Sequence, residues 1–175
     1  MRPALSEDFG RWIDLYEAVA AEGKWIGGEA PVDREMMRHR FDERLAQSGG
    51  RATIFVAEAD REMIGHLGIE ERRGVADLGM LVAVAWRGCG VGSALMKEAL
   101  RWAGEEGAHK VVLQVWPHNQ AALTLYRRFG FVEEGRLRRH YRRRGGELWD
   151  AVLMGIVLDH TSPGSPFDAA QNERP

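Results

Sequence analysis

The feature that most constrains this chain is a glycine-rich turn, Arg87-Gly88-Cys89-Gly90-Val91-Gly92-Ser93. An apolar run precedes the turn and an amphipathic pattern at helical spacing follows it, which predicts a strand, a tight turn and a helix. Three glycines in five residues leave the backbone N–H groups of the turn open to a ligand. The helix start behind the turn adds unpaired donors and partial positive charge. The stretch therefore predicts a phosphate site, and the alternative is a turn that only joins a strand to a helix.

Two familiar phosphate-binding patterns do not fit this turn. The dinucleotide fingerprint needs a third glycine where Ser93 stands. The P-loop needs Gly-Lys-Ser/Thr where the chain has Gly92-Ser93-Ala94. The ligand must therefore be identified from the rest of the sequence.

Composition indicates an ordinary soluble globular protein. A chain of 175 residues suggests one domain, and 45% hydrophobic with 29% charged residues is typical of such a domain. The formal charge of −2 gives no global attraction to nucleic acid or to anionic lipid. Cys89 is the single cysteine, which excludes an internal disulfide and favours a cytoplasmic location. We expect no membrane span, because no apolar run approaches 18 residues, and no metal, because the histidines show no ligand spacing.

Hydrophobic periodicity predicts one domain over residues 1–158 and a polar, disordered tail over 159–175. The predicted helices lie at 6–23, 33–48, 90–106 and 118–129, and the predicted strands at 53–59, 63–70, 77–84, 111–115, 131–137 and 148–158. Strand, helix and strand over 77–115 predict a right-handed crossover between parallel strands. The glycine turn then lies at the carboxyl edge of the sheet, where open α/β sheets bind ligands.

A second motif follows Pro117. Asn119, Ala122 and Tyr126 fall on one face of the predicted helix, where an asparagine and a tyrosine can simply form a half-buried hydrogen-bonding pair. The residue types and their spacing form a more specific pattern, Asn119-x-x-Ala122-x-x-Leu125-Tyr126-x-x-x-Gly130-Phe131, which begins 32 positions after Arg87. Together with Arg87-x-x-Gly90-x-Gly92, this pattern resembles the signatures of the GNAT superfamily of N-acetyltransferases. The resemblance covers residues 2–158.

The resemblance implies a fold class. It is α/β, with a GNAT-like mixed central sheet of about six to seven strands flanked by helices, in the order α-α-β-β-β-α-β-α-β-β. The usual first strand is truncated to residues 1–4. That edge of the sheet is therefore expected to be short or to be completed by a partner in a homodimer.

The resemblance also implies a reaction, in which acetyl-CoA donates its acetyl group to a primary amine by direct attack in a ternary complex. It assigns the pantetheine arm to the strand residues Leu81, Val82 and Val84, and the pyrophosphate to Arg87, Gly88, Cys89, Gly90, Val91, Gly92 and Ser93. Asn119 and Ala122 would lie beside the pantetheine. Tyr126 corresponds to the family's tyrosine general acid, which protonates the departing thiolate.

Acyl transfer also needs a route for the proton that leaves the amine. An alkyl amine with a pKa of about 10 is mostly charged near neutrality, so a base or a water chain must accept that proton. Asp77, Glu29 and Glu70 are the candidates, and each can equally be an ordinary solvated carboxylate. Some members of the family use ordered water alone.

Two features leave other interpretations open. Cys89 could carry an acetyl-cysteine intermediate, because a helix start can lower a thiol pKa, but direct transfer needs no such group. The basic segment comprises Arg136, Arg138, Arg139, Arg142, Arg143 and Arg144. It could be a solvated hairpin, a rim for an acidic substrate, a contact to the 3′-phosphate of coenzyme A or a contact to RNA. Aromatic interleaving in it is slight, with Tyr141 alone, so nucleic acid is not favoured.

No pattern in the sequence identifies the acceptor amine. A polyamine, an amino-acid or antibiotic-like amine and a protein N-terminus all remain open, and the loops at 25–31 and 138–146 are expected to build the pocket. The competing functions are a non-catalytic CoA-binding regulatory module and a nucleotide-binding protein. Asn119 and Tyr126 argue against the regulatory module.

Overall fold

The structure, a computed structural model, describes residues 1–47 and 50–158. The tail predicted at 159–175 and part of the helix stop predicted at Gly49-Gly50 lie outside the described residues. The helices are α1 (Phe9–Ala21), α2 (Arg34–Ala46), α3 (Val91–Glu105) and α4 (Gln120–Arg128), with short 3-10 turns η1 (Ser6–Asp8) and η2 (Val84–Trp86). The strands are β1 (Arg2–Pro3), β2 (Ala52–Ala59), β3 (Glu62–Arg72), β4 (Val75–Val82), β5 (Lys110–Val115), β6 (Val132–Arg142) and β7 (Leu148–Val157).

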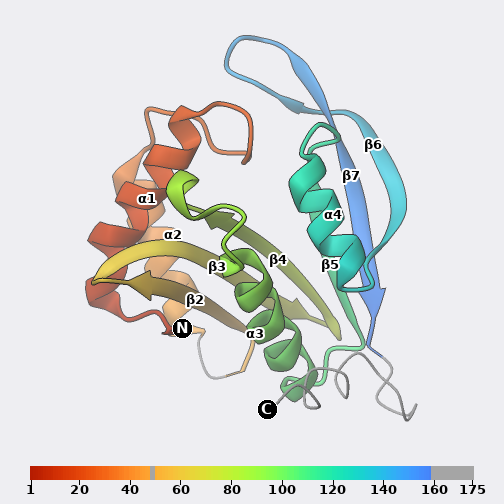
Figure 1. Cartoon of the computed structure of the whole chain (residues 1–175), viewed down its shortest axis with the longest axis horizontal. Coiled ribbons are helices and arrows are strands. Elements are labelled where there is room, and N and C mark those ends of the chain that lie inside the picture. The colour runs from red at the N-terminus through yellow and green to blue at the C-terminus, as the bar shows by residue number, and fades with distance from the viewer. Residues whose placement is uncertain (48–49, 159–175) are drawn as a thin grey trace.

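The strands form one mixed sheet in the order β1-β2-β3-β4-β5-β7-β6. α1 and α2 cover one face of the sheet and α3 and α4 cover the other (Figure 1). The predicted order of helices and strands and the GNAT-like α/β class are confirmed. Within the described ranges, no helix has both the length and the apolar character to cross a membrane.

The two faces of the sheet carry two separate cores. On the α1 and α2 side, Ile13 and Phe41 pack against Val56 of β2. On the α3 and α4 side, Leu95 and Met96 belong to a core with strand residues of β2, β3, β4, β5 and β7. Each large apolar side chain that folding buries contributes about 1.5 to 3 kcal/mol, so both helix pairs are held to the sheet by the same force.

One strand ends earlier than its sequence pattern predicts. The prediction placed a strand over 77–84, but β4 ends at Val82 and Val84 opens the 3-10 turn η2. The last ladder contact is the N–H of Ala83, which donates to the carbonyl of Ile64 at 2.9 Å. Val84 is 69% exposed. The apolar side chain extended the predicted strand, although it packs against no core.

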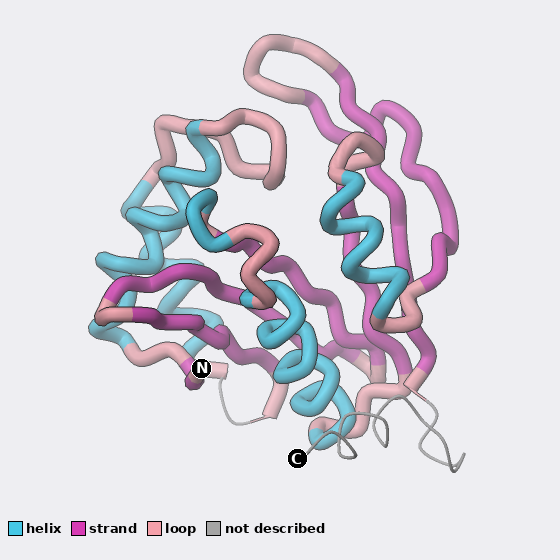
Figure 2. The backbone as a smooth tube through the Cα atoms, viewed as in Figure 1, coloured by secondary structure: helices cyan, strands magenta, loops and turns pink. Residues whose placement is uncertain are grey.

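β4 and β5 are parallel neighbours that soon part. They pair only from Val75 to Asp77, opposite Lys110 to Val112. β4 stays paired with β3 up to Val82, and β5 stays paired with β7 up to Val115. Each half of the sheet therefore continues while the two halves diverge, as Figure 2 shows. The carboxyl ends of the two strands lie on opposite sides of the resulting gap.

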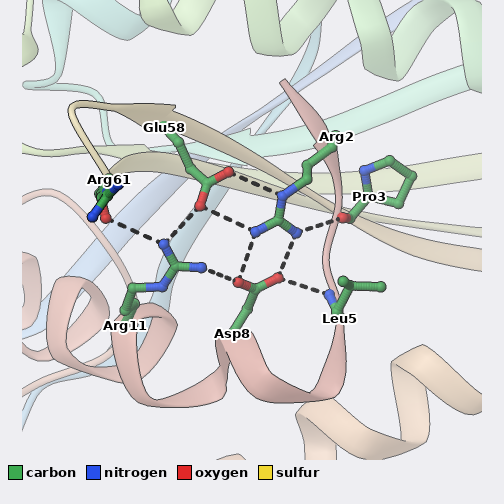
Figure 3. Close-up of polar contacts among 7 residues, drawn as sticks. All are labelled: Arg2, Pro3, Leu5, Asp8, Arg11, Glu58 and Arg61. Carbon is green, nitrogen blue, oxygen red and sulfur yellow. Dashed lines mark hydrogen bonds and ion pairs between the residues drawn. The ribbon is translucent and has the colours of Figure 1, made fainter.

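The truncated first strand is anchored by ion pairs rather than by length. Asp8 is fully buried and accepts hydrogen bonds from both terminal nitrogens of Arg2, at 2.6 and 2.8 Å, and from Arg11 (Figure 3). Glu58 of β2 binds the same two guanidinium groups. These contacts, led by the Arg2 hydrogen bond, hold the pKa of Asp8 well below its usual range. The cluster ties the chain start to the edge of the sheet.

Candidate active site

A cavity of about 900 Å³ lies where β4 and β5 diverge. Its wall includes Gly88, Gly92 and Tyr126 from the α3 and α4 side, and it also includes Trp12 and Met37 from the α1 and α2 side. Ligand pockets commonly have volumes of about 300 to 1,000 Å³. This cavity therefore has room for the reactive end of a cofactor and for a small second substrate.

The glycine turn has the backbone that an anion cradle needs. Gly88 and Gly90 adopt φ values of +78° and +85°, which side chains rarely allow, and a Cβ at either position would meet no atom within 4 Å. Gly90 is the N-cap of α3 and has no side-chain cap, so the N–H groups at the start of α3 lack helical partners. The turn thus fits the predicted pyrophosphate. Gly92 has a packing reason as well, since a Cβ there would lie 3.1 Å from Leu125 of α4.

Arg87 turns away from the glycines. Its terminal nitrogens donate to both carboxylate oxygens of Glu22, at 2.8 and 2.5 Å, and its Nε donates to the Val82 carbonyl at 3.1 Å. The guanidinium also stacks over Trp25. Arg87 therefore ties the turn to the end of α1.

The cation beside the start of α3 is Arg128, which donates to the Ser93 hydroxyl at 2.5 Å. This residue was not predicted from the sequence.

Asn119, Ala122 and Tyr126 reach the same cavity as the turn. Asn119 is the N-cap of α4, and its side-chain oxygen accepts from the N–H of Ala122 at 3.2 Å. Tyr126 is only 6% exposed, and burial raises the pKa of its phenol to about 12. The phenol is therefore protonated at neutral pH and can donate a proton or a hydrogen bond.

The other predicted cofactor residues divide into two groups. Leu81 and Val82 line the cavity with Arg87, Gly88 and Gly92, whereas Val84, Cys89, Gly90, Val91 and Ser93 do not. Cys89 is exposed, and its thiol makes only a long contact of 3.7 Å to the Arg87 carbonyl. A thiol outside the cavity wall is poorly placed to carry an acyl group between substrates.

On the α1 and α2 side, two of the sheet residues that line the cavity are glycines, and this part of the wall is called the floor below. Gly68 of β3 and Gly79 of β4 are directly opposed across the ladder. A Cβ at Gly68 would collide with the Arg44 guanidinium at 2.3 Å, whereas a Cβ at Gly79 would meet nothing within 4 Å. The space above Gly79 is therefore open. Leu81, in the predicted thioester-binding stretch, lies two residues further along the same strand.

A buried polar pair borders this floor. His66, directly opposite Leu81 in the ladder, is 6% exposed, and its ring lies 5.0 Å from that of Trp12. Both ring nitrogens of His66 and the Nε1 of Trp12 are buried and have no hydrogen-bond partner among the described residues. Burial lowers the pKa of His66 to about 3, so the imidazole is neutral. The hydrophobic pattern of β3 did not reveal this histidine as a pocket residue.

The three candidate bases have different surroundings. Glu29 accepts from the N–H of Arg144 at 3.0 Å and lies 3.5 Å from the Arg143 guanidinium, away from the cavity wall. Glu70 lines the cavity and pairs with Arg44 and Arg72. Asp77 is opposite Glu70 in the ladder and, like Glu29, is not one of the residues that line the cavity.

Asp77 reaches solvent and yet sits in a partly desolvated place. The surrounding protein displaces enough bulk water to raise the pKa of its carboxyl, Arg44 opposes the rise, and Glu70 adds to it. Because the side chain is exposed, solvent screens part of this effect. The raised pKa moves the Asp77 carboxyl toward the value that a base needs near neutrality.

Two residues of the arginine-rich segment, Arg143 and Arg144, bind the loop between α1 and α2 and are called the latch below. Arg143 has a side chain only 3% exposed, and it donates to the carbonyls of Gly23, Ile26 and Gly27. Its guanidinium stacks on Trp149 at 4.5 Å. Arg144 adds bonds to the carbonyls of residues 30 and 31. These two arginines fasten the β6–β7 hairpin to the loop between α1 and α2, a structural role that the sequence did not predict.

Comparison with known proteins adds three similarities. The model of the acetyltransferase (GNAT) family matches residues 12–131. An L-amino acid N-acetyltransferase of Escherichia coli (strain K12) is 35% identical over 125 residues, which cover 68% of this chain and 76% of that protein. An L-methionine sulfoximine/L-methionine sulfone acetyltransferase of Pseudomonas aeruginosa is 27% identical, over 92% of this chain and 95% of that protein. The structure of a ribosomal-protein-alanine N-acetyltransferase from Brucella melitensis superposes with a TM-score of 0.81 at 25% identity, over 90% of this chain and 98% of that one.

Proposed function

This chain belongs to the acetyltransferase (GNAT) family and is an acetyl-CoA-dependent N-acetyltransferase, and we propose that its acceptor is the α-amino group of a free amino acid or a close analogue. Both curated relatives described above are named for acceptors of this kind. The observation that carries the proposal is the open floor at Gly79, inside the same cavity as the glycine turn and Tyr126. A small amine fits that place.

The residues around the cavity supply the chemistry as follows. The amine nitrogen forms a bond to the acetyl carbonyl carbon, the carbon–sulfur bond breaks, and the thiolate takes a proton from the Tyr126 hydroxyl. The turn from Gly88 to Ser93 holds the pyrophosphate, and Asn119 and Ala122 border the pantetheine. The backbone N–H of Val82 points away from β3, on the edge of β4 that β5 leaves unpaired, and stabilises the carbonyl oxygen as negative charge develops on it. The thiol of Cys89 forms no acyl intermediate, in keeping with its place outside the cavity wall.

Asp77 is the proton acceptor that we infer for the amine. It lies four residues before Leu81, which corresponds to about 13 Å along a strand. Direct contact with the reacting nitrogen is therefore excluded for an amine held at Leu81, and the proton must travel through water above Gly79. Glu29 is the weaker candidate, because the latch already engages its carboxylate.

Two further expectations concern the setting of the enzyme. The single cysteine, exposed and unpaired, supports a reducing cytoplasm as its compartment. A homodimer stays a prediction that light scattering of the purified chain can test.

A thiol-release assay tests the proposed function. The full chain is incubated with acetyl-CoA and, in parallel, with L-amino acids, polyamines, aminoglycosides and N-terminal peptides, and each product is identified by mass. We expect release above the amine-free rate with amino acids, matched by their N-acetyl products. Release only with another class of amine would overturn the acceptor assignment, and binding of acetyl-CoA without release in any reaction would favour a regulatory module.

A further inference from the structure

One face of α2 borders the acceptor half of the cavity. Met37, Arg40 and Arg44 follow one another at spacings of three and four residues, and all three line the cavity. Residues at such spacings share a helix face. α2 therefore contributes two arginines to the cavity wall, and the guanidinium of Arg44 lies over Gly68.

The four arginines that line the cavity differ in their partners. Arg87 is neutralised by Glu22, and Arg44 and Arg72 both contact Glu70. Arg40 has no carboxylate partner among residues 1–47 and 50–158. Its neighbour one turn away, Glu43, is paired with His39 instead. Arg40 is thus the cavity cation whose charge no described side chain offsets.

The surroundings of Arg40 indicate what it would bind. The cavity that it lines also contains Gly79, where a Cβ would meet no atom within 4 Å, and the aromatic side chains of Trp12 and Tyr16 on α1. Arg40 is close enough to Tyr16 for its charge to counter part of the rise that burial causes in the phenol pKa. An arginine fork matches a carboxylate in shape and charge. The neighbouring aromatic wall suits an apolar side chain.

We propose that Arg40 binds the carboxylate of the amino-acid acceptor and so selects amino acids over amines that lack a carboxylate. This inference rests on the proposed function and assigns it a specificity-determining residue. With its carboxylate at Arg40, the acceptor lies over Gly79 and directs its amine towards Leu81. The amine is then placed beside the thioester and open to the water that leads to Asp77.

The test compares acceptors with and without the carboxylate. The pairs are L-methionine sulfone with 3-(methylsulfonyl)propylamine and L-phenylalanine with 2-phenylethylamine. Steady-state constants are measured for the wild type, Arg40→Gln and Arg40→Lys. Arg38→Gln is the matched control, because Arg38 lies on the same helix, pairs with Asp42 and does not line the cavity.

Arg40→Gln should raise the KM of each amino acid that the wild type acetylates by about 10- to 100-fold, the range expected for a lost charged hydrogen bond. In Arg40→Gln, the kcat and the steady-state constants for the carboxylate-free amines should change little. Arg40→Lys should recover part of the loss in KM. Arg38→Gln should match the wild type. An unchanged amino-acid KM in Arg40→Gln overturns the assignment of Arg40 and leaves the proposed function standing. Absence of acetylation of both amino acids by the wild type, with release from another class of amine, overturns both.

Discussion

Arg87 and Glu22, 65 residues apart in the chain, form a two-point ion pair with nitrogen–oxygen distances of 2.8 and 2.5 Å. Glu22 also accepts from the indole N–H of Trp25 at 2.7 Å. One carboxylate therefore links the glycine turn to the loop that follows α1. Because the first element is proposed to hold the cofactor and the second lines the same cavity, we expect the two binding events to be coupled.

Glu22→Gln should weaken both ligands together. The pair is partly exposed, so we expect a loss of about 1 kcal/mol, or roughly fivefold in the KM of both acetyl-CoA and the acceptor. Steady-state kinetics with each substrate varied in turn provides the measurement. Glu17→Gln is the control, since Glu17 on the same helix pairs with Arg34 far from the turn. A change confined to one substrate would show that the link carries no coupling.

Arg143→Met should loosen the hairpin latch. The variant keeps the length of the side chain but removes the donors to three loop carbonyls, so we expect a loss of about 2 kcal/mol in the free energy of unfolding. That loss corresponds to a fall of about 5 °C in Tm for a chain of this size. Arg142→Met, at an exposed neighbouring position, should melt like the wild type. Equal Tm values for all three proteins would mean that the latch does not stabilise the fold.

His66 should make the protein sensitive to mild acid. The unfolded chain binds a proton at this residue near pH 6.5, but burial lowers the folded pKa to about 3. The unfolded state therefore holds more protons below pH 6.5, and stability falls with pH by up to about 1.4 kcal/mol per unit until about pH 3. His66→Leu should flatten urea-unfolding free energies between pH 6 and 5, where the paired carboxylates Asp8 and Glu58 stay ionised.

The exposed residue His39 supplies the control for this prediction, because its replacement by Gln leaves every core contact in place. His39→Gln should keep the wild-type dependence on pH. If His66→Leu keeps it too, another group titrates in this window.

Gly79→Val should block the acceptor without disturbing the fold. The new side chain enters open space, and a β-branched residue suits a strand. We expect kcat/KM for the acceptor to fall by at least about tenfold, since displacement of a substrate by about 1 Å can cost 100-fold. Acetyl-CoA affinity should be preserved. Gly135→Val, which fills open space on β6 outside the cavity, should behave as the wild type, and an unaffected Gly79→Val would place the acceptor elsewhere.

The parts of the site that the sequence predicted are those built from local patterns. Gly90 at a helix start and Asn119 and Tyr126 on one helix face are positions that spacing alone determines. Gly88 and Gly92 of the first motif and Asn119 and Tyr126 of the second line one cavity. The predicted end of β4 was wrong by two residues because apolar character continued to Val84 without a core to receive it.

The remaining features depend on contacts between distant segments. The opposition of Gly68 and Gly79 follows from strand register, and the latch of Arg143 follows from the reach of a hairpin over a loop more than 100 positions earlier. The hydrophobic periodicity of a single stretch determines neither the register between two strands nor the contact of a hairpin with a distant loop. Arg40 was missed for the same reason, since only the partners of its neighbours reveal its unpaired charge.

The most direct test of the reaction at this site is the comparison of Tyr126→Phe with the wild type in two measurements, the kcat of thiol release and the dissociation constant of acetyl-CoA. The variant removes one oxygen and keeps the ring that packs near Phe131. If Tyr126 protonates the thiolate, kcat should fall by about 100-fold or more while acetyl-CoA affinity stays within about twofold. An unchanged kcat would contradict the assignment of Tyr126 as the general acid.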